Sequence, residues 1–420
     1  MEILVQKYGG SSLATDRQVV LVARRVARAH RRGASVIVVV SARGDTTDDL
    51  LRAAGLVGVA PDPVETDKLL ATGETASAAL LAIALRGLGV PAVSLTGPEA
   101  GLRAVGRPGH GVVASVAVEP VRRWLTERHV VVVAGFQAAS DHGPVITLGR
   151  GGSDTSAVAL AVAHGADRCE IHTDVDGVRR ADPRIVTKPA RLPEIDAGLM
   201  AEMAFSGARV IHTRAVELAA AHGIDITVHN SARLGRGSTI IGRRTGMLDP
   251  GTIEGRAGVA AVTHQLAVGQ LFVRTSRGRL PTAAAIFDAL AQRQITVDSV
   301  TWRTRPDGEL ELSCCIPESA VVDARAAVNR IAGNGGAAWV RRSLATVSAV
   351  GTGLLSRPGL TALAMRAFLE TGIDAECVSA SQARITFLVP AEQVHDAVSA
   401  LYRQFGLGRA GRAEPALATA

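Results

Sequence analysis

The chain has 420 residues, of which 47% are hydrophobic and 3% aromatic, and it carries a formal net charge of +7. A chain of this length has room for two or three domains with ordinary hydrophobic cores. Because the basic residues are mostly scattered arginines and few aromatic rings exist to stack on bases, we expect an anionic substrate and no nucleic-acid partner.

The cysteines and the apolar runs bear on the cellular compartment. The four cysteines lack the CxxC and Cys/His spacings of metal sites, so we expect buried thiols in a reducing compartment. No uninterrupted apolar run reaches the ~18 residues of a membrane span, and no signal peptide precedes the first apolar run. We therefore expect a cytoplasmic protein with no membrane partner.

Short apolar runs alternate with amphipathic helical patterns over residues 1–230. This alternation predicts an α/β fold, a three-layer α/β/α domain whose largely parallel sheet has helices on both faces. Ligands of such sheets bind at the carboxyl ends of the strands. The expected strands are 3–9, 35–42, 91–96, 129–136, 169–175 and 225–230.

The first expected strand runs into a glycine turn in VQKYGGSSLA, residues 5–14. Its lysine, Lys7, precedes the two glycines, which is neither the P-loop order nor the three-glycine dinucleotide fingerprint. Lys7 is one of only three lysines in an arginine-rich chain. Because a compact ammonium suits a phosphate as a point charge, we expect an anion site here.

Two later turns are less specific. In SARGDTTDDLL, residues 41–51, we expect residues 46–48 to cap a helix whose free N–H groups face an anion, although an ordinary cap explains the same pattern. In GETASAALL, residues 73–81, we expect Glu74 at a helix start. There it either complements the helix dipole or holds an ammonium group.

The segment ITLGRGGSDTSAVALA, residues 146–161, is more specific. Its glycines allow close backbone approach, Ser153 and Asp154 are expected to cap the next helix, and Arg150 suits a carboxylate. A capped helix with a surface arginine is the plain alternative. Two glycine-rich, helix-opening turns in one sheet make that alternative weaker.

The turn HTDVDGVRRADPR, residues 172–184, follows a strand and carries acidic residues and a glycine. A Mg²⁺ site, a nucleotide-contacting turn and an ordinary loop all fit this pattern, and EF-hand spacing is absent.

A Gly- and Arg-rich segment at 231–253 marks a domain boundary, and the pattern then changes. Strands expected at 266–275, 295–303 and 309–317 alternate with helices at 282–293 and 319–332, and the same order recurs from 345. Two β-α-β-β-α-β units predict two ferredoxin-like domains. We divide the chain into an α/β domain (1–232), a linker with the first strand of the C-terminal region (233–262), two small domains (263–340 and 341–410) and a disordered tail (411–420).

The catalytic arrangements that the sequence lacks limit the class of reaction. No Ser-His-Asp or Cys-His arrangement and no obvious general base emerge from the spacing. Phosphorylating a carboxylate needs no base, because the acceptor is already ionised at neutral pH. Lysine, helix N-termini and Mg²⁺ then suffice to position the reactants and neutralise charge, so the set fits formation of an acyl phosphate.

Taken together and in this order, the motifs resemble those of aspartate kinase (aspartokinase), of the amino-acid kinase superfamily. They are KYGGSSL, SARGDTTDDL, TGETAS, AGFQ, TLGRGGSDTSAVALA, TDVDGVRRADPRIV and FSGARVIH. The doubled C-terminal repeat resembles the paired regulatory ACT domains of that family, and the resemblance spans nearly the whole chain. It implies that ATP and L-aspartate give 4-phospho-L-aspartate, the entry to lysine, threonine and methionine synthesis. It also implies a homo-oligomer formed through the ACT domains, with an amino-acid effector.

The resemblance also implies roles for single residues. Lys7 would neutralise the transferring phosphoryl group, Asp154 would orient Lys7 and help to place Mg²⁺, and Arg209 would meet the phosphates. The implied nucleotide-binding residues are Lys7, Gly9, Gly10, Ser11, Thr173, Asp174, Arg179, Asp182, Arg184 and Arg209. Glu74 would take the aspartate ammonium and Arg150 its α-carboxylate. The implied substrate-binding residues are Ser41, Thr47, Glu74, Arg150, Gly151, Gly152 and Ser153.

The sequence departs from the family pattern near both substrates. Thr75 replaces the arginine of the family's GERxS motif, and Ala71 replaces a common threonine. Arg179 and Arg180 replace the tyrosine and threonine of DVDGVYTADPR, and Arg209 replaces the lysine of GAKVLH. These changes leave the residues of the core anion site unaltered. They concern the specificity for aspartate and the catalytic rate.

The regulatory region departs further. Trp302 and Arg303 stand where lysine- or threonine-inhibited members carry a Gln-Asn pair, so we expect weak or altered feedback control. Met247 is placed to start a separate regulatory product, as in some family members.

Three alternatives remain at this point. A kinase of another carboxylate or carbamate is kept open by Thr75 and Ala71. A degenerate kinase that serves as an amino-acid-binding regulator is disfavoured by Lys7, Asp154 and Arg150. A nucleic-acid binder is the weakest.

Overall fold

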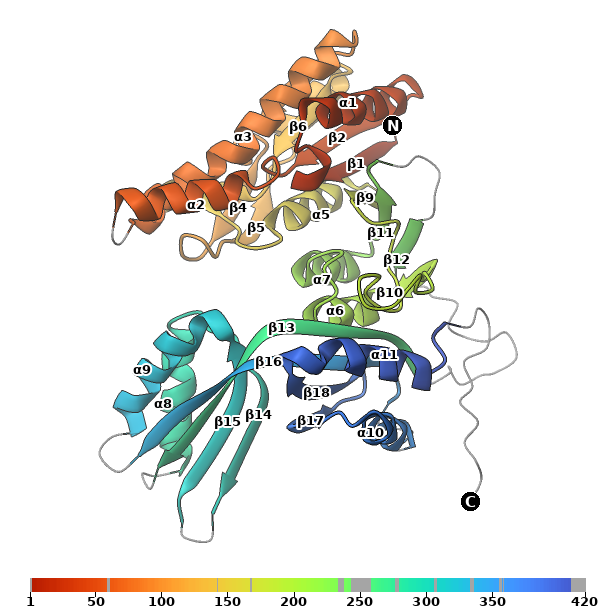
Figure 1. Cartoon of the computed structure of the whole chain (residues 1–420). Helices are drawn as coiled ribbons and strands as arrows, with labels where there is room; N and C mark the ends of the chain where they lie inside the picture. Colours follow the sequence, from red (N-terminus) through yellow and green to blue (C-terminus); the bar gives the residue numbers. More distant parts are fainter. Residues whose placement is uncertain are drawn as a thin grey trace. The chain divides into compact units, whose positions relative to one another are not determined.

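The computed structural model describes residues 2–58, 61–141, 143–166, 168–232, 238–242, 258–275, 279–305, 308–332, 336–354, 357 and 359–408. They form two compact units (Figure 1). Unit 1 comprises Met1–Val178, Arg191–Phe205 and Arg209–Gly255, and unit 2 comprises Arg179–Ala190, Ser206–Ala208 and Arg256–Ala420. Met247, most of the expected linker and the expected tail lie outside the described residues.

Unit 1 is built on an eight-stranded sheet in the order β10-β12-β11-β9-β1-β2-β6-β3. Its pairs are parallel except β11 with β12, so the expected α/β fold with a largely parallel sheet is confirmed. The strands are β1 (Ile3–Tyr8), β2 (Ser35–Val40), β3 (Ala92–Leu95), β6 (Val130–Ala134), β9 (Arg168–Thr173), β10 (Glu194–Asp196), β11 (Asp225–Asn230) and β12 (Ser238–Gly242).

Helices cover both faces of this sheet. Helices α1 (Asp16–Arg31) and α3 (Pro63–Gly87) share a buried core with Tyr8 of β1 and the valines of β2 and β6 on one face. Helix α5 (Gly152–His164) lies against the other face (Figure 1). The remaining helices are α2 (Thr46–Val57), α4 (Glu119–Thr126), α6 (Ala197–Phe205) and α7 (Thr213–His222).

A small second sheet of β4 (Leu102–Val105), β5 (Val112–Val116), β7 (Gln137–Ser140) and β8 (Gly143–Thr147) was not expected from the sequence. Its strands have four or five residues each, too few for a clear alternation of apolar and polar side chains.

Helix α3 corrects the expected position of Glu74. The helix begins at Pro63, capped by Asp62, so Glu74 lies in its middle and not at a helix start. By length and composition α3 could cross a membrane, but half of its most apolar window is buried within the protein. The carboxylates of Asp67 and Glu74 accept hydrogen bonds inside unit 1, which is typical of a core helix.

Unit 2 contains one six-stranded sheet in the order β14-β15-β13-β16-β18-β17. Helices α8 (Arg279–Ala291) and α9 (Val321–Ala332) pack into one core, and α10 (Gly359–Thr371) and α11 (Val394–Gln404) into another. The strands are β13 (Gly258–Thr275), β14 (Asp298–Thr304), β15 (Leu310–Pro317), β16 (Ala337–Thr352), β17 (Cys377–Ala380) and β18 (Arg384–Pro390).

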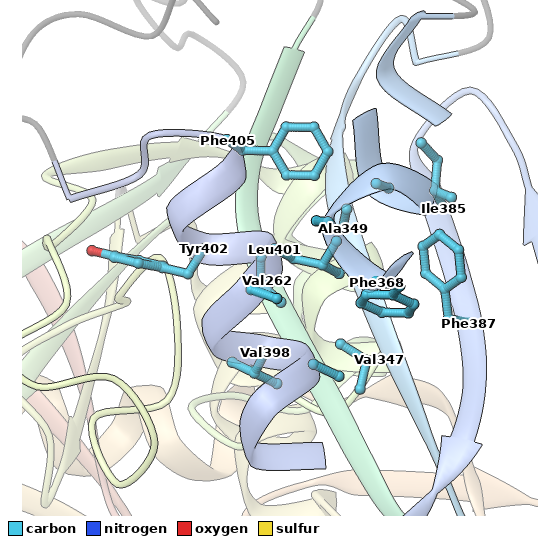
Figure 2. Packing of buried hydrophobic residues seen from close by; sticks show 14 of the residues in the cluster. Val262, Val347, Ala349, Phe368, Ile385, Phe387, Val398, Leu401, Tyr402 and Phe405 are labelled. Atoms are coloured by element: carbon cyan, nitrogen blue, oxygen red, sulfur yellow. The ribbon is translucent and has the colours of Figure 1, made fainter. Parts of the chain in front are cut away.

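The two ferredoxin-like cores are not strictly consecutive along the chain. Strand β13 begins at Gly258, well before the expected 266, and pairs with β16 along most of its length. Val262 from its first half packs with Phe368, Phe387 and Leu401 in the core beneath α10 and α11 (Figure 2). The core expected from 341 onward therefore takes a strand from ahead of residue 263.

Candidate active site

The structure pairs Lys7 with Asp154 at the centre of unit 1. The Lys7 Nζ lies 2.7 Å from Asp154 Oδ1, and both side chains are nearly buried. Asp154 Oδ2 accepts the His212 N–H at 3.3 Å. Because successive side chains alternate along a strand, Lys7 faces α5 while Tyr8 faces α1. An ammonium group is thus held at the carboxyl end of β1.

The glycine turn after Lys7 packs closely on the turn after β2. Residues Gly10–Ser12 form a short 3-10 helix, and the Gly9 N–H donates to the His172 carbonyl at 3.2 Å. A Cβ on Gly10 would lie 2.6 Å from the Ala42 carbonyl oxygen, so only glycine fits there. The turns after β1 and β2 therefore meet beside Lys7.

The expected caps are wrong at two helices. Ser153 and Asp154 lie inside α5, whose N-cap is Gly151 in the left-handed region with φ 70°. Thr46, Thr47 and Asp48 lie inside α2, whose N-cap is Asp45 without a side-chain hydrogen bond. A glycine in the left-handed conformation starts α5 without a capping side chain, which leaves the Asp154 carboxylate available to Lys7.

Gly151 is predicted to be intolerant of any side chain. A Cβ there would lie 2.0 Å from His212 Cγ, whereas Gly165 has a similar φ of 65° and open space around it. We expect Gly165→Ala to cost about 1 kcal/mol of unfolding free energy from backbone strain alone, and Gly151→Ala about 1–3 kcal/mol more from the clash. Denaturant unfolding of both variants checks this, and equal losses would contradict it.

Glu74 places a carboxylate beside the turn after β2. Its Oε1 accepts the Ala42 N–H at 3.0 Å, and its buried Oε2 has no hydrogen-bond partner among the described residues. Burial raises the pKa of Glu74 to about 7. A Cβ on Gly73 would lie 2.9 Å from the Ala42 Cβ, so Gly73 allows this close approach. Ser41 and Thr47 flank the same turn.

Two residues that the sequence analysis missed hold the loop that carries Arg150. Asp67 Oδ2 accepts the N–H groups of Thr147 (2.8 Å) and Gly109 (3.0 Å), while Arg214 donates to the carbonyls of Leu148 and Gly111. Arg150 itself is exposed. Asp67 lies beside Glu65 and Lys68 in the polar first turns of α3, so the sequence carries no signal of its buried role.

Thr173 ends β9, which pairs with β1, and Asp174 follows it. The Thr173 hydroxyl donates to Asp174 Oδ1 at 3.0 Å, and Asn230 Nδ2 donates to the Asp174 carbonyl at 3.0 Å. The ends of β1 and β9 are therefore adjacent, and this turn lies next to the glycine turn.

The other expected nucleotide residues are divided between the units. Arg179, Asp182 and Arg184 belong to unit 2, where Arg184 pairs with Asp182 at 2.7 Å. Burial opposes ionisation of Asp182, but the Arg184 hydrogen bonds prevail and lower its pKa. Arg209 belongs to unit 1 and is exposed.

Thr75 stands where the family has an arginine, and residues 69–80 of α3 contain no other basic residue that could take its place. The Thr75 hydroxyl donates to the Ala71 carbonyl at 2.8 Å, and Gln137 Nε2 donates to the same carbonyl at 2.8 Å. Gln137, from the AGFQ motif, thus bonds to the segment that carries both departures.

The chain is similar to known proteins over nearly its whole length. The amino acid kinase family matches residues 2–230, and an ACT domain family matches residues 347–405. The aspartokinase of Mycolicibacterium smegmatis is 38% identical over 417 residues, with 97% of each chain covered. That of Geobacillus stearothermophilus is 37% identical over 407 residues, covering 97% of this chain and 98% of the relative.

Solved structures give the same result. The aspartate kinase from Synechocystis is 33% identical with a TM-score of 0.53, covering 97% of this chain and 70% of that one. E. coli aspartokinase III in complex with aspartate and ADP shares the fold, with a TM-score of 0.76 at 24% identity over 96% of this chain and 100% of that one. The resemblance expected from the motifs is thereby confirmed, and the chain belongs to the aspartokinase family.

Proposed function

We propose that the chain, as an ATP-dependent aspartate kinase, transfers the γ-phosphoryl group of ATP to the side-chain carboxylate of L-aspartate and gives 4-phospho-L-aspartate. The observation that carries this proposal is the Lys7–Asp154 pair beside the glycine turn, with an unpartnered Glu74 oxygen close to the same turns. Lys7 stabilises the charge of the transferring group, and N–H groups of Gly9, Gly10 and Ser11 cradle it. Thr173, Asp174 and Arg209 contact the nucleotide, while the nucleotide-binding roles of Arg179, Asp182 and Arg184 stay predictions.

Aspartate binds through its α-ammonium and α-carboxylate groups. The buried Oε2 of Glu74 lacks a donor in the described structure, which suits an ammonium group. Arg150 pairs with the α-carboxylate, just before Gly151 and the first residues of α5, Gly152 and Ser153. Ser41 and Thr47 line the pocket at the turn after β2. The acceptor carboxylate then meets the phosphoryl group near Lys7 without a general base.

The residues present fit a Mg²⁺ ion that is carried mainly by the nucleotide. Among the described residues no group of three His, Cys, Asp or Glu side chains is placed to hold a metal. Mg²⁺ commonly takes one or two carboxylates together with substrate phosphates, and Asp154 is the carboxylate at this site. When bound, the ion would neutralise phosphate charge. Asp154 would contact it while keeping Lys7 in place.

The test is ATP consumption in the presence of Mg²⁺ with hydroxylamine as a trap, comparing L-aspartate, L-glutamate and no acceptor. We expect a hydroxamate that depends on L-aspartate. A folded, ATP-binding protein that gives none with aspartate would overturn the proposed acceptor and favour another carboxylate.

Feedback control is predicted to be weak. Trp302 is exposed at the edge strand β14, and Arg303 pairs with Glu311 at 2.9 Å, so the expected effector position carries an indole and a guanidinium. We expect lysine plus threonine at physiological concentrations to inhibit less than half of the activity. Strong inhibition in the same assay would contradict this.

We further infer that the chain forms a homo-oligomer through its ACT domains, which sedimentation tests. We also infer a cytoplasmic location, which cell fractionation tests.

A further inference from the structure

A buried polar cluster lies on the face of the unit 1 sheet opposite Lys7. It consists of Gln6, Arg25, Glu170, His172 and His229, with the Tyr8 ring stacked on the His172 ring at a centroid distance of 4.5 Å, and Arg25 also bonds to the backbone carbonyl of Asn230, whose side chain alternates to the Lys7 face. Gln6 is 3% exposed, His172 4% and Asn230 7%. Arg25 comes from α1 and the others from β1, β9 and β11. The proposed chemistry uses none of these side chains.

The hydrogen bonds in the cluster fix the state of His172. Arg25 Nη1 lies 2.9 Å from His172 Nδ1, and because a guanidinium can only donate, Nδ1 is the acceptor. The imidazole proton therefore sits on Nε2, which lies 3.2 Å from Glu170 Oε2. Burial lowers the pKa of His172, outweighing the opposing hydrogen bond and charge of Glu170, and so favours this neutral form. The ring is thereby held in one orientation.

The same guanidinium reaches the backbone of the site. Arg25 Nη1 also donates to the Asn230 carbonyl at 3.1 Å, and Asn230 Nδ2 donates to the Asp174 carbonyl at 3.0 Å. The carbonyl of His172 accepts the Gly9 N–H at 3.2 Å and the Ser12 hydroxyl at 3.5 Å. Through these bonds, Arg25 is connected by way of His172 to the turn after β1, and by way of Asn230 to the turn after β9.

We propose that Arg25 is a positioning residue for the nucleotide, which sets the glycine turn and the Thr173–Asp174 turn through His172 and Asn230. This rests on the proposed function, because that function assigns both turns to ATP. Arg25 lies behind the sheet from Lys7 and touches no reacting group. It therefore affects nucleotide affinity more than aspartate affinity, since Glu74 and Arg150, which take the two charged groups of the aspartate backbone, lie on α3 and in the loop before α5.

The test measures the Kd for Mg-ADP directly, by calorimetry without aspartate, in the full chain. Arg25→Ala removes both hydrogen bonds, Arg25→Lys keeps one charged donor, and Arg24→Ala is the control, because Arg24 is its exposed neighbour on α1. Losing hydrogen bonds to a charged group predicts a Kd at least about tenfold higher for Arg25→Ala, with partial recovery in Arg25→Lys. We expect KM for aspartate within about twofold of the control.

A Kd equal to that of Arg24→Ala would overturn the positioning role. So would parallel losses in Tm, Kd and the aspartate KM, because those describe a purely structural brace. If Arg25→Ala does not fold, Asn230→Ala and Arg25→Lys carry the test, and native-like Kd values in both overturn it. A native chain that binds no Mg-ADP would overturn the proposed function itself, which separates the two failures.

Discussion

Replacing Lys7 with alanine is expected to lower kcat/KM for aspartate phosphorylation by about 10²–10³-fold, the usual loss when one preorganised donor to a developing charge is removed. Its Nζ is the cationic group 2.7 Å from Asp154 beside the glycine turn. Lys68→Ala is the matched control, because Lys68 is half-exposed and pairs with Glu65 on the surface. The hydroxamate assay measures both variants, and native activity in Lys7→Ala would contradict the assignment.

Loss of stability must be separated from loss of chemistry. Lys7→Ala leaves the Asp154 carboxylate, 8% exposed, without its counter-charge, and breaking a buried pair in this way costs roughly 3–5 kcal/mol. The double variant Lys7→Ala/Asp154→Ala removes both charges. We expect it to recover part of the Tm and none of the activity. Activity that recovers together with Tm would show that Lys7 is only structural.

The fold was largely predictable because most of its strands contain short apolar runs that alternate with amphipathic helical segments. All six strands expected in unit 1 form, and the four expected helices of the regulatory region form at nearly the expected places. The interleaving of the two small cores was not predictable. It depends on β13 continuing along both cores of the one six-stranded sheet, with register shifts near Val268, and the single Gly269 at that point does not distinguish a continuous strand from two.

The site was predictable where the chemistry lies at strand ends. Lys7 and Thr173 lie at the carboxyl ends of β1 and β9 and the glycine turn follows β1, so their convergence follows from a parallel sheet. Glu74 was placed at a helix start because Gly73 resembles a helix boundary, whereas Gly73 in fact gives space for Ala42. Asp67 and Arg25 act through backbone groups distant in sequence, which no local pattern records.

Aspartate affinity is expected to rise with pH through Glu74. Its pKa is raised to about 7 by burial, and only the ionised carboxylate attracts the substrate ammonium. KM for L-aspartate should therefore increase as pH falls below about 7, approaching tenfold per pH unit, and level off above it. Glu74→Gln has no titrating group there, so its KM should be high and nearly independent of pH, while Glu65→Gln on the same helix should behave like the native chain.

The same group predicts a stability change of opposite sense. Because the folded-state pKa of Glu74 exceeds its unfolded value of 4.5, the folded chain binds the extra proton between these values, and stability falls as pH rises from about 4.5 to about 7. The shift corresponds to about 3 kcal/mol. Glu74→Gln should remove this slope from denaturant unfolding measured across the range. A native-like slope in that variant, with a KM that still follows pH, would show that another group titrates and that Glu74 does not hold the ammonium.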